Sequence, residues 1–154
     1  MKKFLKTILL VLIVGLGLFY SYRILIGSPS EQIDETEISE YGYYSSKEDV
    51  ALYIYTFGKL PPNYLTKNEA KDKGWVASKG NLWKVTDHMS IGGDVFTNYQ
   101  GCLPKKKGRK YYECDIDYSG GKRNAKRLVY SNDGLIYYTD DHYETFELLY
   151  GEER

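Results

Sequence analysis

A change of hydrophobic period near residue 90 is the feature of this 154-residue chain that most constrains its fold. Before that point, Val50, Tyr53, Ile54 and Phe57 recur at the spacing of one helix face. After it, tyrosine-rich runs follow the two-residue period of strands, near 91–97, 110–118, 126–131, 134–139 and 143–149. Helices followed by several strands on short connections predict an α+β domain, with the helices packed on one antiparallel sheet.

Local signals predict where the helices begin and end. Ser46 is typical of an N-cap that begins the first helix, and Gly58 is expected to end it. The segment 66–69 has the composition of a capping box, which predicts a second short helix that Gly74 ends. A weaker helical turn is expected near 81–85.

Residues 1–26 have the pattern of a targeting segment. They carry four positive charges and no negative one, around an uncharged, mostly apolar run at 7–22. This run fits either a cleaved signal peptide or an uncleaved membrane tether, and no cleavage motif separates the two. Both alternatives place the rest of the chain outside the cell, secreted or tethered to the outer face of the membrane. Residues 27–43 carry five acids and no base, which predicts a flexible acidic linker before a domain at 44–154.

Composition excludes several classes of protein. Lys and Arg number 21, as do Asp and Glu, and 42% of residues are hydrophobic, which excludes a charged disordered tail and a multi-span membrane protein. Two cysteines are too few for a disulfide scaffold or a four-ligand zinc site. The segment 105–127 holds nine Lys or Arg against three acids. A near-neutral domain with one dense basic stretch predicts a local anionic ligand.

One predicted strand indicates where the chemistry lies. Alternation over 111–118 places Cys114 on the helix-covered face and Glu113 on the opposite face. A row of acids on a strand is usually a solvated sheet face. Here the basic run 122–127 and the segment 141–143, Asp-His-Tyr, offer partners for Glu113. The sequence therefore favours a site on this face.

Longer motifs carry a resemblance to a known family. In chain order they are Y-L-T-K-N-E-A, G-W-V-A-S-K-G-N-L and S-I-G-G-D-V-F-T-N within 64–98, then Y-Y-E-C-D-I-D-Y, R-N-A-K-R-L-V-Y-S and D-H-Y-E-T-F. With these motifs in order and without large gaps, residues 44–149 resemble the barnase-type bacterial extracellular ribonucleases. The resemblance implies N-terminal helices on one face of a five-stranded antiparallel sheet, in agreement with the pattern.

The resemblance also implies an activity and its residues. The expected enzyme is an endoribonuclease that cleaves single-stranded RNA by transphosphorylation to a 2′,3′-cyclic phosphate and then hydrolyses it, with no metal or cofactor. RNA supplies the nucleophile as its own 2′-OH. Matched to the family motifs, Glu113 is the expected base and His142 the expected acid. The residues expected around the phosphate are Lys67, Arg123, Arg127 and, shaping the pocket, Tyr143.

The family resemblance has consequences for partners. It implies a barstar-like intracellular inhibitor protein, and we expect a monomer. The competing hypothesis is a catalytically silent, surface-tethered RNA- or protein-binding module on the same fold. The complete set of Glu113, Arg123 and His142 argues against that module, whereas the altered base-recognition loop and the tether argue for it.

That loop is where the chain departs from the family. The family pattern has Arg and then Glu after its Phe-Ser/Thr-Asn run, and this chain has Phe96-Thr97-Asn98-Tyr99-Gln100. A carboxylate can accept two hydrogen bonds from guanine, whereas the Gln100 side chain offers one uncharged acceptor oxygen. We therefore expect a guanine preference that is weakened or broadened.

The two cysteines flank the basic loop. Cys102 and Cys114 lie twelve positions apart, and an oxidising compartment favours a disulfide between them. Because Cys114 is predicted on the buried face, a pair of ordinary thiols is the alternative.

Overall fold

The structure is a computed structural model that describes residues 38–153. The predicted targeting segment at 1–26 and the linker residues before 38 lie outside the described residues. Between residues 38 and 153 no helix is long and apolar enough to cross a membrane.

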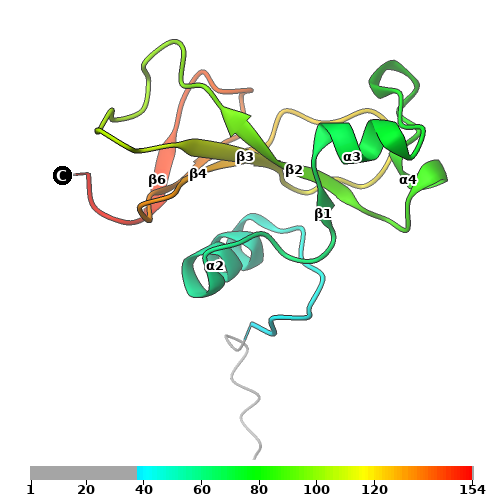
Figure 1. The fold of residues 1–154 in the computed structure, drawn as a ribbon, viewed down its shortest axis with the longest axis horizontal. Helices are drawn as coiled ribbons and strands as arrows, with labels where there is room; N and C mark the ends of the chain where they lie inside the picture. The colour runs from blue at the N-terminus through cyan, green and yellow to red at the C-terminus, as the bar shows by residue number, and fades with distance from the viewer. Residues whose placement is uncertain (1–37, 154) are drawn as a thin grey trace, which may run out of the picture. The chain divides into compact units, whose positions relative to one another are not determined.

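Six strands form one sheet whose spatial order follows the chain order (Figure 1). The strands are β1 (Tyr64–Leu65), β2 (Ser90–Phe96), β3 (Tyr111–Asp115), β4 (Arg127–Ser131), β5 (Ile136–Thr139) and β6 (Glu147–Tyr150). Ahead of the long strands lie the helices α2 (Lys47–Phe57), α3 (Lys67–Asp72) and α4 (Leu82–Val85), with a 3-10 turn at Ala77–Lys79. This arrangement confirms the α+β prediction.

The predicted sheet lacked one strand. From β2 to β6 every neighbouring pair is antiparallel, as expected. The additional β1 pairs parallel to β2 through Tyr64–Ser90 and Leu65–Ile91 only. A strand of two residues is too short to show a period, so the sequence pattern could not reveal it.

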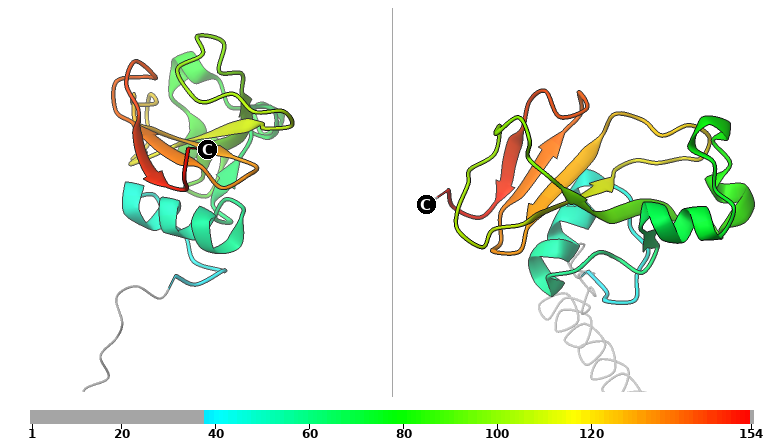
Figure 2. Two further views of the ribbon diagram at one scale, coloured as in Figure 1. Left: turned by 90° about the vertical axis from the view of Figure 1, so that its left-hand side faces the viewer. Right: turned by 45° about the horizontal axis from the view of Figure 1, so that its top comes forward.

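The first helix begins and ends as its sequence predicts. The Ser46 hydroxyl accepts a hydrogen bond from the Asp49 N–H, and Gly58 ends α2 in the left-handed conformation with φ of 67°. The buried side of α2, with Val50 and Ile54, packs on one face of the sheet (Figure 2). The sheet contributes Cys114, Leu128 and Ile136 to this cluster, and Ile116 joins it from directly after β3.

The two shorter helices lie at one end of the sheet instead of across its face (Figures 1 and 2). Thr66 and Glu69 form the predicted capping box at the start of α3. Behind it, a separate cluster joins Ala70, Trp75 and Leu82 to Ile91 of β2. This cluster holds α3 against the start of β2, so the N-terminus of α3 is fixed relative to the sheet.

The last residues of the predicted linker contact the domain. The Tyr53 hydroxyl donates a hydrogen bond to the Glu40 carbonyl at 2.7 Å, and Lys59 pairs with the Glu40 carboxylate at 2.6 Å. Glu40 is therefore held beside α2, and the domain boundary at residue 44 stays a prediction.

The disulfide favoured from the sequence is not formed in this structure, because Cys102 and Cys114 are both free. Cys114 is buried beneath α2, directly opposite Gly92 of β2. Cys102 is exposed and lines a cavity with His142 and Tyr143, which lie on the other side of the sheet. The sheet itself separates the two thiols, which spacing along the chain does not reveal.

Candidate active site

The sheet face opposite α2 carries the predicted catalytic carboxylate. Glu113 sits in the middle of β3, and its residue is 7% exposed. It is not on a solvated face, because Tyr111 and Val129 on the same face belong to an apolar cluster with Leu103 and Tyr137. Glu113 is thus a nearly buried carboxylate that needs partners to stay ionised.

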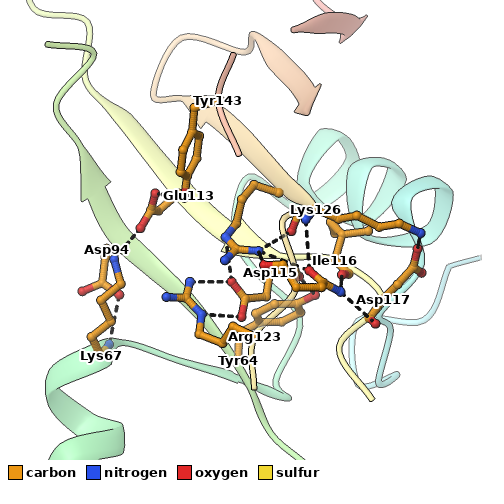
Figure 3. Close-up of polar contacts among 12 residues, drawn as sticks. Tyr64, Lys67, Asp94, Glu113, Asp115, Ile116, Asp117, Arg123, Lys126 and Tyr143 are labelled. Atoms are coloured by element: carbon orange, nitrogen blue, oxygen red, sulfur yellow. Dashed lines mark hydrogen bonds and ion pairs between the residues drawn. The ribbon is translucent and has the colours of Figure 1, made fainter. Parts of the chain in front are cut away.

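Two side chains supply those partners (Figure 3). The Lys67 ammonium donates to one carboxylate oxygen of Glu113 at 2.5 Å, and the Tyr143 hydroxyl donates to the other at 2.5 Å. Burial raises the pKa of Glu113, but these hydrogen bonds and the neighbouring positive charges lower it by more, so the net shift is downward. The Glu113 carboxylate is therefore ionised at neutral pH.

Lys67 reaches Glu113 because β2 anchors the start of α3. The carboxylate of Asp94 accepts a hydrogen bond from the Lys67 backbone N–H at 2.9 Å. Asp94 also lies directly opposite Glu113 in the register of β2 and β3. The first turn of α3, its capping box and β3 are consequently fixed together. Asp94 was not among the predicted site residues, since nothing in its local sequence pattern distinguishes it from an ordinary strand acid.

A buried carboxylate orients two arginines beside Glu113. Arg123 makes a bidentate contact with Asp115, at 2.7 and 2.5 Å (Figure 3). The Arg127 Nε lies 3.0 Å from Oδ1 of Asp115, the oxygen that also accepts from Arg123 Nη2. The side chains of Asp115 and Arg127 are 1% and 2% exposed, whereas that of Arg123 is 22% exposed. Arg123 is thus the member of this triad that faces solvent.

Arg127 is held from several directions. Its guanidinium also donates to the carbonyls of Asn124 and Lys126, at 2.8 and 2.6 Å. With so many protein partners, Arg127 is placed to fix Asp115 and the segment before β4. Its predicted contact with the phosphate stays a prediction.

The loop between β5 and β6 presents His142. His142 and Tyr143 both adopt positive φ, 61° and 76°, a conformation that costs roughly 1–3 kcal/mol for each such residue. Asp141 holds this loop by accepting hydrogen bonds from the hydroxyl of Thr139 and the N–H groups of Glu144 and Thr145. The strained turn leaves His142 exposed, with its ring 4.8 Å from that of Tyr143.

His142 lines a cavity of about 350 Å³. It is here named the base pocket, after the RNA base that the loop at 96–100 is predicted to bind. Its other walls are Phe96, Thr97, Asn98, Tyr99, Gln100, Cys102, Tyr143 and Phe146. Asn98 is buried and clamps the loop by hydrogen bonds to both backbone groups of Leu103. Tyr99 is 94% exposed at the rim. The structure therefore brings all the predicted base-binding residues together, with Asn98 as the residue that shapes the loop.

Comparison with known proteins identifies the family. The profile of a family described as Ribonuclease matches residues 47–150. The chain belongs to this ribonuclease family. A ribonuclease of Heyndrickxia coagulans is 57% identical over 99 residues, which are 64% of this chain and 91% of that protein. A ribonuclease of Bacillus intermedius has the same identity over 99 residues, 61% of its length. Guanyl-specific ribonuclease St of Saccharopolyspora erythraea is 36% identical over 90 residues, 58% of this chain and 79% of that protein.

The family membership confirms two sequence-based predictions. The chain is an endoribonuclease, and its substrate is RNA. Of the predicted residues, Lys67, Glu113 and Tyr143 form one hydrogen-bonded group, which His142 adjoins through Tyr143. Over residues 38–153, no three His, Cys, Asp or Glu side chains cluster as metal ligands would.

The structure adds three carboxylates to the predicted ribonuclease site. Asp94, Asp115 and Asp141 orient Lys67, Arg123 and the His142 loop, respectively. For Asp115 a sequence signal existed, because it lies two residues from Glu113 and shares its sheet face. Asp141 precedes His142 directly, but its several hydrogen bonds depend on the fold of the loop.

Proposed function

We propose that this ribonuclease cleaves single-stranded RNA by transphosphorylation to a 2′,3′-cyclic phosphate, followed by hydrolysis, without a metal ion. The observation that carries the proposal is the buried Glu113 carboxylate, kept ionised by Lys67 and Tyr143 beside the exposed His142. An ionised carboxylate and an imidazole suit a reaction that needs a base and an acid at one phosphodiester.

In the first step Glu113 takes the proton of the 2′-OH. The 2′-oxygen then forms a bond to phosphorus, and the bond from phosphorus to the 5′-oxygen breaks. His142 gives a proton to the departing 5′-oxygen. In the second step the roles reverse: His142 takes a proton from water, whose oxygen attacks phosphorus, and Glu113 returns its proton to the 2′-oxygen. Each of these proton transfers typically contributes about 10²–10⁴-fold in rate.

Positive charge stabilises the charge that develops on the phosphoryl oxygens. The Lys67 ammonium lies against Glu113 and can move to a phosphate oxygen once the carboxylate gains a proton. Arg123 is held in one orientation by Asp115 and is exposed enough to donate its remaining N–H groups to a phosphate. The chain thus supplies two cations without a metal.

We propose that the base pocket prefers guanine, but less strictly than a site with a carboxylate at position 100. The relative named guanyl-specific supports guanine as the base. The neutral Gln100 at the exposed rim supports the weaker preference, since its one acceptor oxygen cannot take two charge-assisted hydrogen bonds. Tyr99 offers a ring on which any base can stack.

Initial rates on the dinucleotides GpC, ApC, CpC and UpC, in excess EDTA, test this proposal. We expect GpC to be cleaved fastest, and Gln100→Glu to raise the ratio of kcat/KM for GpC to that for ApC by about 10–100-fold, the worth of a hydrogen bond to a charged group. The matched variant Gln100→Ala lacks the new charge and should not raise the ratio. An unchanged ratio in Gln100→Glu would contradict this role of residue 100.

Three further properties remain proposals. The basic and apolar pattern of residues 1–26 supports secretion, or tethering to the outer face of the membrane through residues 7–22. The family resemblance supports a barstar-like inhibitor that protects the producing cell. The compact domain with its own cores supports a monomer.

A further inference from the structure

A second concavity adjoins the base pocket. It measures about 460 Å³ and shares Phe96, Thr97 and Asn98 with the base pocket as a common wall. Its remaining lining comes from Val95, Tyr111 and the loop 104–110. We name it the basic groove. The loop between β2 and β3 that lines this groove lies at the end of the sheet remote from α4 (Figures 1 and 2).

Four cations line the basic groove, and they fall into two pairs. Arg109 makes a bidentate contact with Asp133, and the Lys106 ammonium lies 3.7 Å from the same carboxylate. Hydrogen bonds from Arg109 and Ser131 lower the pKa of Asp133 to about 2, so this carboxylate stays charged. Within the described part of the chain, no acid forms an ion pair with Lys105 or Lys110, and both are exposed. Two ammonium groups are therefore available to an anionic ligand.

The same groove offers apolar surface to a base. Val95 is 62% exposed there, and the half-buried Phe96 forms part of the wall. Positive charge that follows a phosphate backbone, next to apolar or aromatic surface for the bases, is how proteins bind single strands without reading their sequence. The chemistry of the groove thus fits one nucleotide of the same RNA strand.

The position of the groove sets the direction of that strand. In the proposed function, the scissile phosphate lies on the 3′ side of the nucleotide in the base pocket and is held at Glu113. Of β3, only its first residue, Tyr111, lines the groove, two residues or about 7 Å from Glu113, and the lining includes neither Glu113 nor His142. The part of the RNA that leaves the base pocket on the side away from the scissile phosphate is the 5′ continuation of the bound nucleotide.

Building on the proposed function, we propose that the basic groove is an RNA subsite for the nucleotide on the 5′ side of the one in the base pocket. Lys105 and Lys110 bind its phosphate, and Val95 and Phe96 contact its base or sugar. Substrates that extend in the 5′ direction should therefore be cleaved with a higher kcat/KM than the bare dinucleotide.

Chimeric oligonucleotides with a single ribonucleotide test the subsite. In every substrate the single ribonucleotide is a guanosine, and deoxycytidine follows it. Because only this guanosine carries a 2′-OH, the bond on its 3′ side is the one cleaved in every substrate. Three forms are compared: the dinucleotide, a form extended by two deoxythymidines on the 5′ side, and one extended by two on the 3′ side. The enzyme variants are Lys105→Ala/Lys110→Ala and the control Lys71→Ala/Lys84→Ala, which removes two exposed lysines at the α3 and α4 end.

The subsite predicts a selective loss. In Lys105→Ala/Lys110→Ala, kcat/KM for the 5′-extended substrate should fall about tenfold, with the dinucleotide rate unchanged and a shallower dependence on salt. The control variant should keep the wild-type pattern on all three substrates. Equal losses on all substrates, or a loss confined to the 3′-extended one, would overturn the subsite. If the wild-type enzyme cleaved none of the three chimeras, the proposed function itself would be refuted.

Discussion

The substitutions Glu113→Ala and His142→Ala should each reduce kcat/KM for RNA by about 10²–10⁴-fold, because each removes one proton transfer from the proposed reaction. The other histidine of the chain provides a matched control. His88 is exposed and its ring contacts Trp83, away from the base pocket. His88→Ala should therefore retain wild-type activity. A Glu113→Ala or His142→Ala enzyme within a few-fold of wild type would remove that residue from the mechanism.

The pH profile separates a base from a merely structural carboxylate. Because the pKa of Glu113 is lowered, the wild-type enzyme should keep an ionised base below the ordinary glutamate value of about 4.3. Its kcat/KM should fall only as the pH drops through this lowered pKa. Lys67→Ala removes the hydrogen bond that lowers it most, so the acid limb should move to higher pH. If the acid limb of the kcat/KM profile were unchanged in Glu113→Ala, the titrating group would be a residue other than Glu113.

Asp115→Asn should lower the free energy of unfolding by about 3–5 kcal/mol, the usual cost of removing one partner from a buried ion pair. Asp115 lies between Arg123 and Arg127, and its side chain is 1% exposed. Without this charge, the buried Arg127 loses its counter-ion and Arg123 loses its bidentate anchor. The activity that remains in the folded variant should also be reduced.

Asp117→Asn is the matched control, measured in parallel by urea unfolding. Asp117 pairs with Lys126 at 2.7 Å, and both side chains are 43% exposed. Exposed pairs contribute about 0–1 kcal/mol, so this variant should unfold near the wild-type urea concentration. Asn also tolerates the positive φ of Asp117, which keeps the comparison free of backbone strain. Equal effects of the two substitutions would show that Asp115 is no more important than a surface acid.

The sequence predicted best those features that depend on neighbours along the chain. The cap at Ser46, the capping box at Thr66 and the strand periods are local signals, and the structure has α2, α3 and five of the six strands in segments that overlap those predicted, although β6 begins only at Glu147. Alternation also placed Glu113 on the face away from α2. The family motifs supplied the functional roles, which periodicity alone does not contain.

The features that the sequence missed depend on contacts between distant segments. The burial of Glu113 is set by an apolar cluster that includes Leu103 and Tyr137, and the placement of Lys67 by Asp94. The disulfide prediction failed for the same reason. The expected oxidising compartment favoured a bridge, but Cys102 and Cys114 lie on opposite sides of the sheet.

The most direct test of the account is phosphorus NMR of GpC incubated with the enzyme in excess EDTA. The account predicts that a signal for guanosine 2′,3′-cyclic phosphate appears first and is then replaced by that of the 3′-phosphate. In Glu113→Ala and His142→Ala the first signal should grow about 10²–10⁴-fold more slowly. Binding of the dinucleotide without cleavage, or cleavage without a cyclic phosphate, would contradict the account.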